Sequence, residues 1–415
     1  MKLKNTVFMS GVITTVRLST GFLSNKVLAV FIGPAGIALL AQFQSFVNIV
    51  TVIATGAVDK GVVKYSSELK ENDVERYKML STAFILCLVV SIICGIVIVC
   101  SSHYLAALLQ INLKYIFVFY ALAGVLIAYS LNQLLMSLIN GVGDINLYTW
   151  ANLIGSVIGL IFTYFLSVKY GVSGALIAIV AAQSLNFIIT LFLAIKYRVI
   201  NLRKLNFQLN HEYLHKLNKF SLISITIVLC TSLTQIITRD YLMQQVSIDF
   251  AGYWLGIQRI SDAYLMIITT ALTTYYLPTI ARLKNFEDIK DELYRGYSFI
   301  IPLIIASATL IYIFRHAIIL ILYSKKFLPM ADLFIWQFIG DIFKICGSMI
   351  AQVIMARSMV KLYILSEVLY NAFYILSAII FIHLFGGMGS VISFTVTYFF
   401  YFIILYFLLM RRYVC

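Results

Sequence analysis

Long apolar runs separated by short polar breaks dominate the chain from end to end. A helix needs about 20 mostly apolar residues to cross the ~30 Å hydrocarbon core of a bilayer, and about twelve of the runs are long enough. We therefore predict an all-α polytopic membrane protein with about twelve transmembrane helices. The expected spans are residues 7–32, 37–58, 79–100, 115–139, 148–168, 174–195, 220–243, 253–277, 297–314, 332–356, 362–385 and 390–410.

The basic residues lie mostly in every second polar break. If both termini are cytoplasmic, 21 of the 31 Lys and Arg residues fall in inside segments, five in outside segments and five in spans. Because an excess of Lys and Arg in cytoplasmic loops sets the orientation of a membrane protein, we expect both termini in the cytoplasm. The net charge of +14 then follows from this bias, and nucleic-acid binding is not needed to explain it.

The two halves of the chain repeat at an offset of 215 or 216 residues. The matched landmarks are Gly36 with Gly252, Leu147 with Leu362, Gly171 with Gly386, and Gly174 with Gly389. Six spans per half give both halves the same orientation, as in transporters whose two lobes are related by an axis along the membrane normal. We predict an N-terminal lobe (1–195), a cytoplasmic linker (196–219) and a C-terminal lobe (220–415), pseudo-symmetric around a central cavity.

The composition leaves no room for a separate soluble domain, because 62% of the residues are hydrophobic and only 12% are charged, against about 25% charged in soluble proteins. One segment, residues 211–215, matches the His-Glu-x-x-His pattern of zinc proteases. Catalytic zinc needs a third protein ligand, and residues 216–239 contain no Asp, Glu or His. We expect a short interfacial helix there, and neither a metal nor a cofactor.

The first span carries two basic residues, Arg17 and Lys26, without an acidic neighbour in the same helix. A charge at membrane depth is costly and usually faces a cavity or a partner. The two residues are nine apart, which places them on roughly opposite faces of a helix, so one of them can instead snorkel or bridge to another helix. A basic cavity selects an anion, and Arg and Lys suit phosphate.

Other charges lie in the second half, where Arg259 with Asp262 and Asp341 with Lys344 are three residues apart and share a helix face. Each pair can be self-neutralising, which would help its helix to insert. Alternatively, Asp262, Asp341 and Glu367 can titrate and couple transport to protons, since burial raises the pKa of a carboxyl. Both interpretations remain open from the sequence.

Several blocks of the sequence resemble the Wzx-type flippases for lipid-linked oligosaccharides, in the multidrug/oligosaccharidyl-lipid/polysaccharide exporter superfamily. The blocks are Leu-Ala-Val-Phe-Ile-Gly-Pro-Ala-Gly at 28–36, Ile-Ser-Asp-Ala-Tyr-Leu at 260–265, Tyr-Leu-Pro-Thr at 276–279, Gly-Asp-Ile-Phe-Lys at 340–344 and Tyr-Ile-Leu-Ser-Glu-Val at 363–368. The resemblance runs nearly end to end. It is greatest to enterobacterial flippases that move lipid III of the common antigen, or O-antigen units.

The resemblance implies a V-shaped exporter of twelve helices with a cationic central cavity, located in the bacterial inner membrane. Such a protein flips an undecaprenyl-diphosphate-linked oligosaccharide from the cytoplasmic to the periplasmic leaflet by alternating access. Its expected partners are that substrate, membrane lipids, and a polymerase and chain-length regulator of the same pathway. The basic cavity positions of the family fall on Arg17, Lys26, Arg239 and Lys344, and Arg259 is a further candidate; Asp240, directly after Arg239, departs from the family pattern.

Two other functions stay open from the sequence. An ion-coupled multidrug exporter of the same fold would favour cations and should show a net acidic cavity. A polyprenyl-lipid sugar polymerase typically needs a large outer loop or an acidic catalytic motif, whereas the longest outer loop here has about 17 residues. We expect a transporter with no catalytic residues rather than an enzyme.

Overall fold

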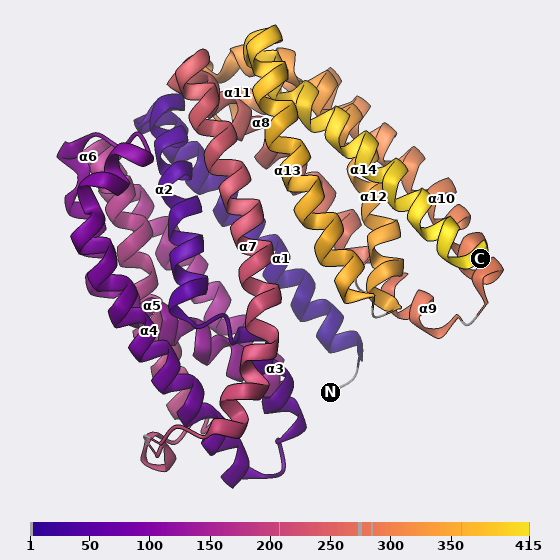
Figure 1. Cartoon of the computed structure of the whole chain (residues 1–415). Coiled ribbons are helices and arrows are strands. Elements are labelled where there is room, and N and C mark those ends of the chain that lie inside the picture. The colour runs from indigo at the N-terminus through magenta and orange to yellow at the C-terminus, as the bar shows by residue number, and fades with distance from the viewer. Residues whose placement is uncertain (1–2, 207, 273–275, 284, 358, 415) are drawn as a thin grey trace. The chain divides into compact units, whose positions relative to one another are not determined.

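A computed structural model describes residues 3–206, 208–272, 276–283, 285–357 and 359–414. The described residues form helices joined by short turns, with no strand among them (Figure 1). The helices are α1 (Leu3–Phe31), α2 (Gly33–Ala54), α3 (Asp59–Glu68), α4 (Asp73–Leu108), α5 (Phe117–Val142), α6 (Ile145–Lys196), α7 (His211–Gln245), α8 (Ile248–Ala271), α9 (Leu277–Arg282), α10 (Phe286–Ile313), α11 (Arg315–Leu322), α12 (Phe334–Ala356), α13 (Val360–Phe385) and α14 (Gly389–Val414).

Each of the twelve predicted spans overlaps helical structure, apart from residues 273–275 of the span 253–277, which lie outside the described residues. The all-α membrane fold is thereby confirmed. Among the described residues, seven helical stretches are long and apolar enough to cross a membrane by themselves. The count of twelve crossings therefore stays a prediction. The long helices exceed the predicted spans because the polar residues at their ends are also helical. For example, α4 starts at Asp73, and the Asn72 side chain caps it by accepting a hydrogen bond from the Glu75 N–H at 3.2 Å.

The helices separate into two compact units. The N-terminal unit comprises Met1–Ile32 and Leu39–Ser232, and the C-terminal unit comprises Gly33–Ala38 and Leu233–Cys415. In the first, α1 packs against α6, and α5 packs against α3, α4 and α6; in the second, α14 packs against α12 and α13. The boundary between the two units falls inside α7, so residues 196–219 belong to the N-terminal unit. The division into two lobes with a separate linker, expected from the sequence, stays a prediction.

The internal repeat predicted from glycine spacing recurs in the backbone of the two units. Gly171 interrupts α6 with φ 56° and ψ −131°, and Gly386 ends α13 with φ 57° and ψ −138°. A positive φ is readily adopted only by glycine. The break at Gly171 divides the 52 residues of α6 into two arms of about 38 Å each, which are both long enough to cross the hydrocarbon core.

A second pair of glycines allows the chain to pack tightly just after each break. A Cβ at Gly174 would lie 1.8 Å from the Leu166 carbonyl oxygen, and a Cβ at Gly389 would lie 2.0 Å from that of Phe381. Gly174 and Gly389 are repeat partners, and so are the two carbonyls. Each unit therefore makes the same backbone contact between consecutive helical arms, at a distance that excludes any side chain.

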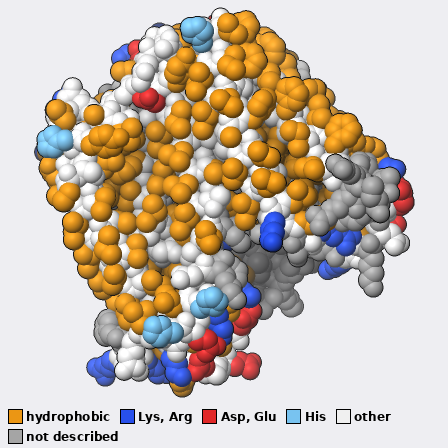
Figure 2. All heavy atoms as spheres, in the orientation of Figure 1, with side chains coloured by type: hydrophobic (Ala, Val, Ile, Leu, Met, Phe, Trp, Pro, Cys, Tyr) orange, Lys and Arg blue, Asp and Glu red, His pale blue; other side chains and the backbone are white. Residues whose placement is uncertain are grey.

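At one end of the N-terminal unit, charged side chains replace the apolar surface. Figure 2 shows hydrophobic side chains over the helices of this unit, and Lys, Arg, Asp and Glu gathered near the end that holds α3. The residues after α6 fold back there onto α4: the Asn201 N–H donates to the Tyr77 hydroxyl at 2.8 Å, and Lys204 pairs with Asp73 at 3.2 Å. This charged end marks one boundary of the apolar band.

The carboxyl of Asp59, the first residue of α3, is an unusual member of this charged end. Its Oδ1 is buried and has no hydrogen-bond partner among the described residues. Burial raises the pKa of the Asp59 carboxyl from 3.8 to about 6, and a hydrogen bond from Thr55 offsets part of that rise. The folded protein therefore holds a proton on Asp59 that the unfolded chain releases.

We predict that the Gly174→Ala variant unfolds at a lower temperature than the wild type, because the added methyl group forces the α6 arms apart. Overpacking of this kind costs about 1–3 kcal/mol. Thermal unfolding of the purified protein in detergent measures the effect. Gly159→Ala, on the same helix with open space around it, is the control and should keep or raise stability; equal behaviour of the two variants would contradict the close backbone contact.

We also predict that Asp59 makes stability depend on pH. Between about pH 4 and pH 6 the folded state binds more protons at Asp59 than the unfolded state does, so this contribution to stability is lost as the pH rises through that window. The Asp59→Asn variant should lose the dependence and be more stable than the wild type at pH 7. Unfolding temperatures of both proteins from pH 4 to pH 7 test this; parallel curves would show that the pKa of Asp59 is the same in the folded and unfolded states.

Candidate ion-pair network and its relatives

A charged pair joins α8 and α12 within the C-terminal unit. The Lys344 ammonium lies 2.8 Å from Oδ1 of Asp262, with side-chain exposures of 26% and 67%. The three-residue spacings predicted partners within one helix, Arg259 with Asp262 and Asp341 with Lys344. The observed ion pair instead joins two helices, Lys344 on α12 and Asp262 on α8. The Lys344 side chain is long enough to reach the facing helix as well as the neighbouring turn of α12.

The other predicted carboxylate on α12, Asp341, is fully buried and is bound by neutral donors. Its Oδ1 accepts hydrogen bonds from the Ser261 hydroxyl at 2.6 Å and from the Gln337 amide at 3.2 Å, and its Oδ2 accepts one from the Tyr264 hydroxyl at 2.7 Å. Three donors thus satisfy a carboxylate that has no contact with water. Together with Lys344 and Asp262, Asp341 fastens α8 to α12.

The three donors were not predicted, although a signal was present. Ser261 and Tyr264 flank Asp262 in the block at 260–265 that carries the family resemblance, and Gln337 lies one helical turn before Asp341. Polar residues on the same face as a buried charge are candidates for its partners. The sequence does not say which of two nearby carboxylates they bind.

The predicted carboxylate Glu367, on α13, lies beside a cluster of tyrosines. The Tyr401 hydroxyl donates to Oε1 of Glu367 at 3.1 Å, and the Tyr370 ring lies 4.9 Å from Tyr398 and 5.1 Å from Tyr401 between centroids. In the described part of the chain the Glu367 carboxylate is thus bound by a hydroxyl rather than by a cation. Its role in coupling or ion pairing stays a prediction.

Arg239, on α7, is placed inside the C-terminal unit. It is only 2% exposed; its guanidinium lies 5.9 Å from the centre of the buried Trp254 ring and donates to Gln235 Oε1 at 3.4 Å. A cation over an indole face is stabilised by the ring quadrupole. In this conformation the Arg239 guanidinium offers no accessible face to a ligand. Arg259, on α8, is partly buried.

The two remaining basic residues of the prediction, Arg17 and Lys26, lie on α1 of the N-terminal unit. Lys26 is partly buried, and the side chain of Arg17 lies outside the described residues. The structure thus brings together Asp262, Asp341 and Lys344 in one network. The binding roles assigned to the five basic residues remain predictions.

The block at 28–36 has a structural explanation within the C-terminal unit. Asp249, at the start of α8, accepts a hydrogen bond from the Ala35 N–H at 3.0 Å, which caps the first turn of α2. A Cβ at Gly252 would lie 2.2 Å from the Pro34 carbonyl oxygen, so this glycine lets α8 contact the α2 backbone. The repeat landmarks Gly36 and Gly252 therefore belong to two segments that pack against one another.

The His-Glu-x-x-His segment forms the beginning of α7. Glu212 pairs there with Lys216 one turn later. Among the described residues, no group of three His, Cys, Asp or Glu side chains is arranged to hold a metal ion.

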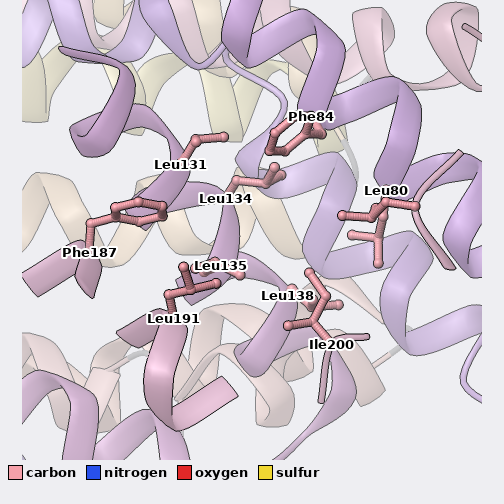
Figure 3. A pocket seen from close by; sticks show the side chains of 10 residues that line it. Leu80, Phe84, Leu131, Leu134, Leu135, Leu138, Phe187, Leu191 and Ile200 are labelled. Carbon is pink, nitrogen blue, oxygen red and sulfur yellow. The ribbon is translucent and has the colours of Figure 1, made fainter. Parts of the chain in front are cut away.

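A cavity of about 240 Å³ in the N-terminal unit has, among the described residues, a lining of apolar side chains only (Figure 3). Leu131, Leu134, Leu135 and Leu138 of α5 point into it, and Ile200, after α6, closes one side. Such a lining offers no hydrogen bond to a sugar and no charge to a phosphate. This cavity is therefore not a site for a polar headgroup.

Comparison with known proteins identifies the family. The family model described as polysaccharide biosynthesis protein matches residues 27–332. A protein named lipid III flippase, from Escherichia coli K12, is 30% identical over 402 residues, which cover 96% of each chain. The chain belongs to the polysaccharide biosynthesis protein family.

This polysaccharide biosynthesis family member is a multi-pass membrane protein of the flippase type, a transporter rather than an enzyme. Solved structures show the same fold. The lipid II flippase MurJ in an inward closed conformation matches with a TM-score of 0.74 at 15% identity, over 98% of this chain and 87% of that one. An inward-facing multidrug resistance MATE transporter matches with a TM-score of 0.70 at 16% identity, over 96% and 98%.

We predict that Asp341→Ala destabilises this family member by about 2 kcal/mol or more, because it leaves three buried donors without an acceptor. Asp341→Asn keeps one acceptor oxygen and should cost less. Thermal unfolding of the purified variants, followed by tryptophan fluorescence, gives the comparison. Asp332→Ala, at an exposed carboxylate before α12, is the control; an equal effect of Asp341→Ala and Asp332→Ala would show that the network contributes nothing.

Proposed function

We propose that the protein flips an undecaprenyl-diphosphate-linked oligosaccharide, such as lipid III or an O-antigen unit, from the cytoplasmic to the periplasmic leaflet by alternating access. The observation that carries the proposal is the 30% identity to lipid III flippases over 96% of both chains. In this proposal the protein lies in the bacterial inner membrane with both termini in the cytoplasm. A polymerase and a chain-length regulator of the same pathway act with it.

The physical task of such a flippase is to carry the diphosphate across the membrane. Moving an ion of that size into a medium of low dielectric costs on the order of 20 kcal/mol by the idealised Born estimate. Basic residues at membrane depth lower this cost, and the polyprenyl tail can remain in the lipid throughout. We assign the diphosphate to Arg17, Lys26, Arg239, Arg259 and Lys344, of which Arg239 has to leave its buried position beside Trp254 to take part.

Among these residues Lys344 has the geometry that best supports the assignment. Its partner Asp262 is 67% exposed, whereas Lys344 itself is 26% exposed, so the carboxylate of this pair is the partner that can turn away. A diphosphate carries more charge than one carboxylate and accepts several hydrogen bonds at once. The substrate can therefore replace Asp262 as the partner of Lys344, while Asp341 keeps α12 in place.

We predict that the protein restores delivery of the lipid-linked unit to the periplasm in a bacterial strain without its own lipid III flippase. Lys344→Ala should reduce delivery at least about tenfold, since it removes a charge-assisted contact of about 1.5–3 kcal/mol, and Lys344→Arg should retain part of it. Lys70→Ala changes an exposed lysine between α3 and α4 and serves as the matched control. The assay scores the periplasmic unit relative to the amount of protein in the membrane.

Each result decides a different point. Full delivery by Lys344→Ala at wild-type protein levels would remove Lys344 from the site and leave the flippase function standing. If the wild type fails to deliver the unit but extrudes cationic drugs, the function is that of an exporter like the MATE neighbours.

A further inference from the structure

The N-terminal unit holds a second cavity, of about 410 Å³, whose lining is rich in side-chain amides. Asn132 and Gln133 of α5 face it, together with Asn152, Gln183 and Asn186 of α6. Among the side chains that the structure describes, no Asp, Glu, Lys or Arg lines it. An amide carries both a donor and an acceptor and no charge, so the cavity suits neutral polar groups rather than ions.

The cavity lies deep in the apolar part of the unit. Asn132 precedes the end of α5 by ten residues, and Asn186 precedes the end of α6 by ten, which corresponds to ~15 Å at 1.5 Å per residue. This is about half the thickness of the hydrocarbon core. Polar side chains at that depth are costly and usually mark a pathway or a site.

Two of the amides carry acceptors that have no partner in the described part of the chain. The Oδ1 atoms of Asn132 and Asn186 are buried and have no hydrogen-bond partner among the described residues, and Asn132 is only 8% exposed. The next amide is used differently: Nδ2 of Asn152 donates to the Tyr148 carbonyl at 2.8 Å. A buried acceptor without a donor costs about 1–3 kcal/mol. A bound molecule that donates hydrogen bonds to these two oxygens would remove that cost.

A comparison of matched positions in the two repeat units shows that the fold does not require this cavity. At an offset of 215 residues, Gly155, Gln183 and Asn186 correspond to Tyr370, Tyr398 and Tyr401, whose rings pack together in the C-terminal unit. In the N-terminal unit, Gly155 has no side chain, and the Asn186 amide packs directly against it, since a Cβ there would lie 2.9 Å from Nδ2 of Asn186. The same place is filled by rings in one unit and kept open and polar in the other.

We propose that the amide-lined cavity binds hydroxyl groups of the sugar unit, separately from the diphosphate. The proposal rests on the proposed function, of which it names the headgroup site. Sugar hydroxyls donate to the free Oδ1 atoms of Asn132 and Asn186 and accept from amide N–H groups. Tyr148 also lines the cavity and adds an aromatic side chain beside the amides.

Binding of two probes to the purified full-length protein tests the inference. N,N′,N″-triacetylchitotriose represents a neutral oligosaccharide, and undecaprenyl diphosphate represents the lipid without sugar. A molecule that binds the folded state raises the unfolding temperature. The trisaccharide should stabilise the wild type, and Asn132→Leu, which is similar in size but has no acceptor, should weaken its apparent Kd about tenfold, as expected for the loss of one hydrogen bond.

Two further variants make the result specific. Asn140→Leu, an exposed position on α5 outside the cavity, should bind the trisaccharide like the wild type. If Asn132→Leu does not fold, Gln183→Leu, at a partly exposed position in the lining, replaces it with the same expected weakening. Undecaprenyl diphosphate should stabilise Asn132→Leu as it does the wild type and should lose its effect in Lys344→Ala.

The inference is overturned if the trisaccharide does not stabilise the wild type, as expected of a cavity that holds only water, or if it stabilises Asn132→Leu equally. Failure of the proposed function gives a different pattern: the wild type neither binds undecaprenyl diphosphate nor delivers the lipid-linked unit in cells, whatever the trisaccharide does.

Discussion

The fold depends on one constraint, which is that a polar group carried to membrane depth needs a partner inside the protein. Asp341 shows how this is met. Its carboxylate is fully buried and accepts three hydrogen bonds, from Ser261, Tyr264 and Gln337. Two of these donors lie on α8, so satisfying the charge also fixes α8 against α12. Lys344 and Asp262 add an ion pair across the same two helices, in a more exposed position where the pair can open.

The sequence predicted the fold well because the signals for it are local. Apolar length decides where helices lie, and glycine spacing revealed the repeat that Gly171 and Gly386 share in backbone conformation. The short helix α3 was not predicted, because its ten residues are mostly polar and no apolar run marks it. Helix ends were missed where charged turns continue a span, as at the start of α4.

The site was harder to predict because partners depend on how helices face one another. A spacing of three residues is compatible with pairing inside a helix and with pairing across helices, and only the packing of α8 on α12 selects Asp262 for Lys344. Arg239 illustrates the same limit: its charge suggested a ligand site, yet it lies over Trp254 with 2% exposure. The amides around Asn132 gave no signal at all, since single Asn and Gln residues in apolar runs carry no spacing rule.

The repeat ties these observations together. Two copies of one helical pattern share backbone geometry at Gly174 and Gly389 but differ in what they place inside. Asn152 and Asn186 of the N-terminal unit correspond to Glu367 and Tyr401 of the C-terminal unit, where hydroxyl and carboxylate bind each other at 3.1 Å. A pair that satisfies itself leaves no donor or acceptor for a ligand, whereas free amide oxygens do. The two copies thus share backbone geometry at their glycines and differ in the side chains at these matched positions: the C-terminal unit holds a bonded Tyr401–Glu367 pair, and the N-terminal unit holds amides, of which Asn186 keeps a buried oxygen with no partner among the described residues.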